Sequence, residues 1–157
     1  YDLDASVKCS NFIGETIDMA VECGFEKMLL TGHIGKLVKV SGGIMNTHSR
    51  EADCRVELLV AAGLRAGVSR DNLMKILDSA TTTEAIAYLE EEKKTKPVMD
   101  YLMERIIYYM NKRAGGKMKI ECILYDNQYG ELAKSEGAEE FLHELQHENV
   151  NANETTI

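Results

Sequence analysis

The chain has 157 residues, of which 45% are hydrophobic and 28% are charged, and its formal net charge is −8. These values are typical of one soluble globular domain with an apolar core, and the length is too short for two comfortable domains. No apolar run approaches the roughly 18 residues of a membrane span, and no signal-peptide pattern is present, so neither a membrane protein nor a secreted one is expected.

The first part of the chain predicts a helix, a strand and a short second helix. Residues 11–23 place apolar side chains at helical spacing, and Gly24 is suited to end that helix. The apolar run "KMLL" at 27–30 predicts a buried strand. The run "GKLVKV" at 35–40 predicts a short helix that ends before the Gly-Gly pair that follows.

Helices dominate the middle of the chain. Ser69 precedes the apolar stripe of one helix, and Thr81 with Glu84 fits the reciprocal capping box of the next. Pro97 is expected at the first position of a longer helix. The apolar face of that helix is predicted to consist of Met99, Leu102, Met103, Ile106 and Met110.

The last predicted elements indicate the fold class. Apolar and polar residues alternate over 117–126, which predicts a second strand, and an amphipathic helix is expected over 135–147. We expect a helix-rich α/β domain over residues 1–148 and a polar tail over 149–157. The predicted strands are too few for a complete sheet. We therefore expect this chain to be a piece of a longer protein, with the missing strands upstream.

The cysteines are widely spaced and include no Cys-x-x-Cys motif. They are Cys9, Cys23, Cys54 and Cys122. A disulfide framework is therefore not expected, which favours a reducing, cytoplasmic location. Cys122 lies in the apolar run "KIECILY" and is expected to behave as a small buried residue.

Charge is unevenly distributed along this acidic chain. Residues 27–50 contain four basic side chains and no acidic one, whereas the whole chain has 18 basic and 26 acidic residues. A positive segment on a negative protein favours a small anionic ligand over a nucleic acid, because the rest of the protein would repel a long polyanion. Chance is the alternative, since the density of basic residues in this segment is ordinary and only the lack of acids is unusual.

The run "TGHIGK" follows the predicted strand and leads into a helix. Backbone N–H groups at such a junction can receive a carboxylate or a phosphate. The run is not a Walker loop, because Leu37 replaces the Ser or Thr that would meet magnesium, and it lacks the leading Gly-x-Gly of a dinucleotide fingerprint. Gly32, Gly35 and Lys36 are the candidate binding residues, and a tight turn with a solvated lysine is the alternative.

The run "NTHSREADCR", residues 46–55, is a second candidate site. Five consecutive polar side chains stand ahead of a predicted helix, whereas a helix cap needs only one. Arg50 and Arg55 can hold carboxylates in a two-pronged fork. His48 can titrate near neutrality or act as a donor. The remaining candidates of this run are Asn46, Thr47 and Ser49.

The run "HELQH", His143 to His147, matches the zinc-protease pattern, in which two histidines bind the metal and the glutamate acts as a base. Only a polar tail follows, which offers no third ligand, and further glutamates crowd the segment. A solvated helix face is therefore favoured and no metal ligand is assigned. A zinc hydrolase is the third of the functions considered.

Two stretches, "VKCSNFIGETIDMA" and "LLTGHIGKLVKVSGGIMNTHSREADCRVE", resemble the C-terminal half of the CbiD family. These proteins are the cobalt-precorrin-5B C1-methyltransferases of anaerobic cobalamin biosynthesis. The resemblance is close over residues 7–65 and looser afterwards, and its most specific parts are "GHIGKLVK" and "IMNTHSR". Cys54 departs from the pattern, because a small residue such as Gly is expected there.

This resemblance implies a transferase that moves a methyl group from S-adenosylmethionine to ring carbon C1 of a cobalt-containing tetrapyrrole. The cobalt would arrive with the substrate. The family has an N-terminal portion with a signature that is absent here and a C-terminal portion of Rossmann-like α/β type. The missing N-terminal portion is therefore an expected partner, and this chain by itself is expected to be inactive. The site of S-adenosylmethionine stays unknown, and a homo-oligomer is possible.

A tetrapyrrole with acetate and propionate side chains is a small polyanion, which suits the acid-free basic segment. The substrate-binding residues implied are Gly32, Gly35, Lys36, Lys39, Asn46, Thr47, Ser49, Arg50 and Arg55, in one pocket at the strand ends. His33 and His48 are the candidates for catalytic proton handling. A non-catalytic tetrapyrrole-binding module, with no affinity for S-adenosylmethionine, is the alternative. Neither nucleic acid nor membrane is an expected partner.

Overall fold

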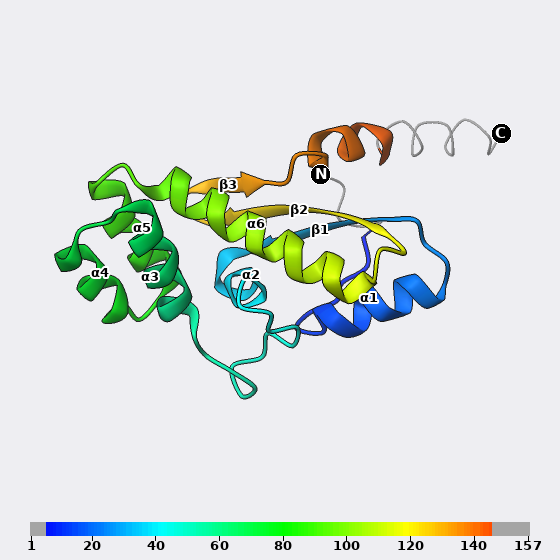
Figure 1. The fold of residues 1–157 in the computed structure, drawn as a ribbon, viewed down its shortest axis with the longest axis horizontal. Coiled ribbons are helices and arrows are strands. Elements are labelled where there is room, and N and C mark those ends of the chain that lie inside the picture. The colour runs from blue at the N-terminus through cyan, green and yellow to red at the C-terminus, as the bar shows by residue number, and fades with distance from the viewer. Residues whose placement is uncertain (1–5, 146–157) are drawn as a thin grey trace.

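Helices pack against a small open sheet in the computed structural model, which describes residues 6–145 (Figure 1). In chain order the elements are α1 (Ile13–Glu22), β1 (Lys27–His33), α2 (Ile34–Val40), α3 (Arg55–Ala66), α4 (Arg70–Leu77), α5 (Thr82–Glu91), α6 (Thr95–Ala114), β2 (Lys119–Asp126) and β3 (Gly130–Lys134). A further helix covers residues 138–145. The mixed α/β class predicted from the sequence is confirmed.

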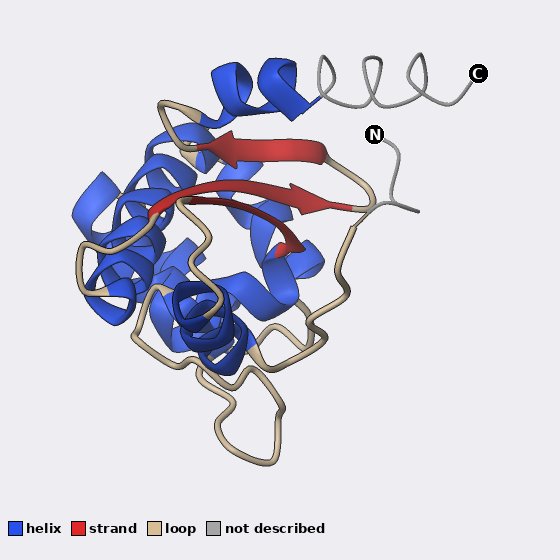
Figure 2. Ribbon diagram, turned by 90° about the vertical axis from the view of Figure 1, so that its right-hand side faces the viewer, coloured by secondary structure: helices blue, strands red, loops and turns tan. Residues whose placement is uncertain are grey.

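The sheet has the strand order β1-β2-β3 in the described part of the chain. β1 pairs with β2 in parallel, from Lys27 opposite Lys119 to His33 opposite Tyr125, and β3 returns antiparallel to β2. Figure 2 shows most helices gathered on one side of this sheet and the helix of residues 138–145 apart from them. The sheet is therefore open and small, as the scarcity of strand patterns predicts.

The core lies between the sheet and α6. The predicted apolar face of α6 is confirmed, since Met99, Leu102, Met103, Ile106 and Met110 are all buried. They pack with Ile120, Cys122 and Leu124, which alternate along β2 and so share one face of the sheet. The helix ends at Gly115, whose positive φ of 62° suits a glycine cap.

Several local predictions need correction. Pro97 is the third residue of α6 and not its first, which the first turn of a helix tolerates because its N–H groups have no helical partner. The Thr81 hydroxyl caps α5 as predicted, but the carboxylate of Glu84 accepts the N–H of Ala80 at 2.9 Å instead of closing the reciprocal box. The predicted helix over 135–147 is described over 138–145. Its last residues and the predicted tail lie outside the described part of the chain.

The strand predicted at 27–30 continues to His33, and Gly32 lies inside it. Neither Gly32 nor Gly35 has a positive φ, and α2 starts directly after β1 without a separate turn, although Lys36 is solvated as the tight-turn alternative expected. A Cβ at position 32 would meet Leu37 of α2 at 2.7 Å. Gly32 is therefore needed because α2 folds back onto the strand that precedes it.

No helix of the described residues is long and apolar enough to cross a membrane.

Candidate functional site at the carboxyl ends of the parallel strands

The parallel strands β1 and β2 end side by side, and each ends on a polar residue. His33 is the last residue of β1, and Asp126 is the last residue of β2. The imidazole Nε2 lies 3.4 Å from the carboxylate Oδ2. Because ligands of open α/β sheets bind beyond the carboxyl ends of the strands, this pair marks a candidate site.

Asp126 is held as an anion although only 1% of its surface is exposed. Its Oδ1 accepts the N–H groups of Gln128 at 2.7 Å and Tyr129 at 3.3 Å, and its Oδ2 accepts the hydroxyl of Thr83 at 2.8 Å. Burial would raise the pKa of Asp126, but these hydrogen bonds and the nearby His33 outweigh burial and lower the pKa. The strand ends therefore carry a fixed negative charge.

His33 is positioned by a hydrogen bond at Nδ1 and by a longer contact of Nε2 with Asp126. Its Nδ1 accepts the N–H of Gly35 at 3.0 Å, which makes His33 the side-chain cap of α2. An accepting nitrogen carries no proton, so the proton lies on Nε2, which faces Asp126. The ring of Tyr125 meets the imidazole edge-on, with centroids 5.6 Å apart. In this arrangement His33 has no free lone pair, and it could act as a base only after releasing Gly35.

The buried side chain of Lys39 holds the loop between α2 and α3 through hydrogen bonds. Only 2% of its surface is exposed. Its Nζ donates to the carbonyl oxygens of Thr47 at 3.1 Å and Ala52 at 2.8 Å. The sequence predicts Lys39 as a substrate-binding cation, but the structure buries the ammonium and directs it to the protein's own backbone. Lys39 therefore holds the loop and is not presented to a ligand.

The same loop is joined to the start of α1. The N–H of Thr47 donates to the carbonyl of Asn11 at 2.9 Å, and the Thr47 hydroxyl lies 3.2 Å from Asn11 Oδ1. Asn46 forms an isolated antiparallel bridge with Phe12, and its Oδ1 accepts the N–H of His48 at 3.1 Å. Asn46 and Thr47 of "NTHSR" thus support the loop itself.

His48, Ser49 and Arg50 stay exposed on this loop. The Nδ1 of His48 accepts the N–H of Arg50 at 3.1 Å, so its Nε2 faces away from this contact. The side chain of Arg50 is 82% exposed, and its nearest acidic atom, on Glu51, is 3.9 Å away, which is a weak surface contact. These three residues are the part of the run that a ligand can reach.

Arg55 already has a carboxylate partner. Its guanidinium donates to both oxygens of Asp53, at 2.7 and 3.0 Å. These hydrogen bonds, with a smaller contribution from the Lys39 ammonium, lower the pKa of Asp53. Asp53 lies just beyond the acid-free segment 27–50, so the charge pattern of that segment does not predict the ion pair between Asp53 and Arg55. Of the four predicted substrate-binding cations, Lys36 and Arg50 are the two that remain exposed.

The two predicted segments contact different parts of α2. His33 and Gly35 lie at the start of α2, whereas the loop that carries "NTHSR" is anchored to Lys39 near its end. Among the described residues, no hydrogen bond or ion pair joins residues 32–36 to residues 46–50. The first segment lies at the strand ends, and a common pocket of the two segments stays a prediction.

Asp126 and Thr83 are parts of the site that the sequence does not single out. In the sequence, Asp126 is only the end of an alternating run, and Thr83 is only one residue of a capping motif. A carboxylate at the carboxyl end of a strand is a usable signal. That signal requires knowing that β1 and β2 are parallel neighbours, which no local pattern shows.

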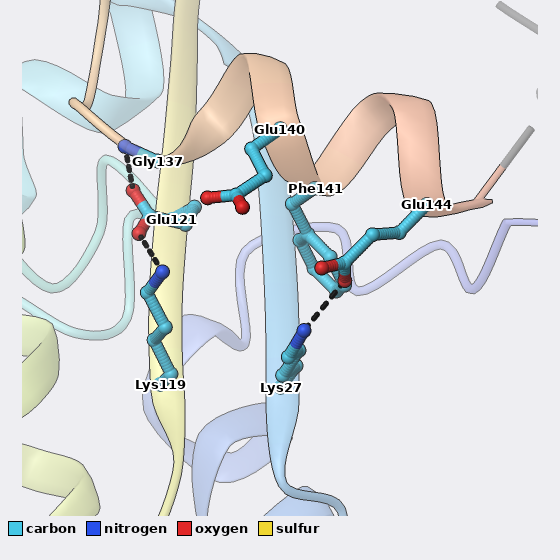
Figure 3. Close-up of a pocket in the computed structure, with 7 residues that line it drawn as sticks. All are labelled: Lys27, Lys119, Glu121, Gly137, Glu140, Phe141 and Glu144. Atoms are coloured by element: carbon cyan, nitrogen blue, oxygen red, sulfur yellow. Dashed lines mark hydrogen bonds and ion pairs between the residues drawn. The ribbon is translucent and has the colours of Figure 1, made fainter.

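A small pocket lies at the opposite end of the same strands, under the helix of residues 138–145 (Figure 3). It has about 210 Å³ of empty space, part of it open to solvent, and is lined by Lys27, Lys119, Glu121, Gly137, Glu140, Phe141 and Glu144. Glu121 accepts the N–H of Gly137 at 3.1 Å and the hydroxyl of Ser135. The enclosed cavity is only about 10 Å³, the room for one water molecule, so these contacts serve to join helix and sheet.

Within residues 6–145, no three His, Cys, Asp or Glu side chains are placed to hold a metal ion. In the "HELQH" run, Glu144 lies 2.5 Å from Lys27, and His147 is outside the described residues. The four cysteines are free. Burial, with the charge of Glu121, raises the pKa of Cys122 to about 12, so Cys122 is the buried thiol that its apolar context predicts.

Residues 46–136 match the protein family described as "CbiD, C-terminal domain". This range covers more than half of the chain and includes both the "NTHSR" loop and Asp126. The chain belongs to the CbiD family. The resemblance carried by the two sequence stretches is therefore confirmed.

Relatives in this family share the name cobalt-precorrin-5B C(1)-methyltransferase. The protein of Ruminiclostridium cellulolyticum is 44% identical over 83% of this chain, and that of Alkaliphilus metalliredigens is 38% identical over 92%. The protein of Methanocaldococcus jannaschii is 39% identical over 84%. The chain spans 34–38% of the length of these three relatives. No solved structure matches the chain.

Lys39→Met is expected to destabilise the chain, because it leaves the carbonyl groups of Thr47 and Ala52 without their donor. A buried group left unpaired costs about 1–3 kcal/mol. Urea denaturation measures this loss as the free energy of unfolding. Lys36→Met, at an exposed lysine of the same helix, is the control and should stay within about 0.5 kcal/mol of the wild type. Equal effects of the two substitutions would contradict the role given to Lys39.

Acid is expected to remove the contribution of Asp126 to stability. The pKa of Asp126 is lower in the folded chain than the ordinary value of about 3.9, so the stabilisation is present above that pH and is lost as the pH falls through the folded value. Asp126→Asn should therefore weaken the acid dependence of the unfolding free energy, measured with urea between about pH 2 and 6. The control is Asp71→Asn at an exposed position, and identical pH profiles for the two variants would refute the assignment.

Proposed function

We propose that this chain is the C-terminal part of a cobalt-precorrin-5B C(1)-methyltransferase of anaerobic cobalamin biosynthesis. The complete protein transfers a methyl group from S-adenosylmethionine to ring carbon C1 of the cobalt-precorrin. The observation that carries the proposal is the CbiD family match, supported by relatives that bear this name. Because the chain spans about a third of their length, the remaining portion is its first partner.

The relatives are named methyltransferases, and such an enzyme requires a methyl donor. S-adenosylmethionine is the donor we propose, while the cobalt belongs to the substrate. The described residues do not fit a donor site. The oxygens of Asp126 are occupied by Gln128, Tyr129 and Thr83, and the pocket under residues 138–145 is too small. We therefore assign the donor to a site that the rest of the protein completes.

The exposed basic residues support a contact with the substrate. A cobalt-precorrin carries carboxylates on its rim, and each can accept charge-assisted hydrogen bonds. Lys36 in the first turn of α2 and Arg50 on the following loop are exposed cations in a segment without acids. Ser49 and His48 lie beside Arg50 and offer further polar contacts. Holding the ring in line with the donor can supply a large part of the catalysis of such a transfer.

The pairing of the strands supports a Rossmann-like sheet, which we propose as the finer fold class. β1 and β2 are parallel neighbours joined by a long helical crossover, as in doubly wound folds. The free cysteines fit the cytoplasmic location proposed for the enzyme.

The activity is tested by incubating the complete protein with cobalt-precorrin-5B and S-adenosylmethionine and measuring the mass of the product by mass spectrometry. We expect a product with one additional methyl group, formed only when both substrates are present. A protein that binds the corrinoid but neither binds S-adenosylmethionine nor forms product would be the non-catalytic binding module instead. A protein that binds neither would overturn both functions.

Charge reversal of the two exposed cations tests the substrate contact. Arg50→Glu and Lys36→Glu in the complete protein are each expected to weaken corrinoid binding by about 10–100-fold, as expected for a lost charge-assisted hydrogen bond. Titration followed by the visible spectrum of the corrinoid measures the affinity, at low and high salt. Arg70→Glu makes the same charge change on the exposed side of α4 and serves as the control. Affinities unchanged by the first two variants would refute this placement.

A further inference from the structure

β1 is an edge strand whose sequence is that of an interior strand. In the described sheet it pairs with β2 on one side only. Strands of parallel sheets are normally covered on both faces and rich in apolar residues, and β1 carries the consecutive apolar residues Met28, Leu29 and Leu30. None of the seven residues of β1 is fully buried, whereas six of the eight residues of β2 are. The strand thus has the sequence of a buried element without the burial.

The open edge of β1 also lacks the features that protect natural edges. Exposed edge strands usually carry central charges, a proline or a bulge that prevents another strand from pairing. β1 pairs with β2 without a register shift over its whole length. The single lysine of this strand, Lys27, lies at its first position and not at its centre. A regular, unprotected edge of seven residues is a template for a further strand.

α1, the helix that leads into β1, also carries uncovered apolar side chains. The helix packs mainly against α6 through its buried Ile13 and Ile17. On its outer side Met19 is 63% exposed, and Phe25, in the turn that leads into β1, is 61% exposed. Large apolar side chains left in water on the helix and turn that lead into this strand indicate a surface that another element covers.

We propose that the outer edge of β1 is the docking site of a further strand of the same protein, supplied by the chain upstream of the described residues. α1 then connects that strand to β1 and covers it, as a helix does in a βαβ unit. The inference rests on the chain being the C-terminal part of a longer enzyme, of which it spans about a third. A second copy of the chain is the competing occupant.

Amide hydrogen exchange in the complete protein tests the docking. In a strand, backbone groups of alternate residues point to opposite neighbours, so half of the amides of β1 face away from β2. We expect these outward amides to exchange as slowly as those of β2, and at least about tenfold slower than unprotected amides. Exchange of every second β1 amide at close to the unprotected rate would show an open edge and overturn the proposal. Protection that disappears on dilution would assign the edge to a second copy and also overturn it.

A matched pair of variants tests the cover over α1. Met19→Asp in the complete protein is expected to lower the midpoint of thermal unfolding by several degrees, because it places a charge in a covered apolar surface. Leu64→Asp, at a residue of α3 that is 68% exposed, is the control and should leave the midpoint unchanged. Equal midpoints for the two variants would refute the cover. Methyl transfer is assayed separately, so a protected edge in an inactive protein refutes the proposed function and not the docking.

Discussion

The parallel pairing of β1 with β2 is the constraint on which the rest of this structure depends. Parallel strands cannot be joined by a tight turn, and here residues 34–118 form the crossover between the two neighbours. All the helices from α2 to α6 therefore belong to one connection. α6 is the last helix of this connection, and its apolar face packs against β2 and β3 and supplies much of the core. The same pairing brings His33 and Asp126 together although 92 positions separate them.

Local patterns predict the helices well, because a helix is specified by neighbours in sequence. The five apolar residues of α6, the Ser69 cap of α4 and the Thr81 cap of α5 all follow from spacing and capping chemistry. β3 is missed, since "GELAK" has no β-branched or aromatic residue and two of its five residues are charged. Its strand conformation comes from pairing with β2, which is a tertiary effect.

The candidate site is less predictable than the fold, because the role of a polar residue depends on what lies beside it. Lys39 and Lys36 have the same chemistry and lie three positions apart, yet one is buried against backbone carbonyls and the other faces solvent. Arg55 and Arg50 differ in a similar way, since Arg55 forms an ion pair with Asp53 whereas Arg50 is exposed. The family resemblance points to two segments, but it does not distinguish residues that hold a loop from residues that a ligand can reach. Cys54 shows the same limit, since its φ of −129° makes no demand for the small residue expected there.

The long crossover also determines the order in which this fold can be completed. A ribosome adds about 5–20 residues per second, so roughly 5–20 s separate the synthesis of β1 from that of β2. The contacts among α3, α4 and α5 are close in sequence and can form during this interval. Until α6 and β2 emerge, β1 has no partner on its inner side, and a strand made earlier is the neighbour that can pair with it first. The sheet is then completed from β1 toward β3, with the core closing only when the last third of the chain has been made.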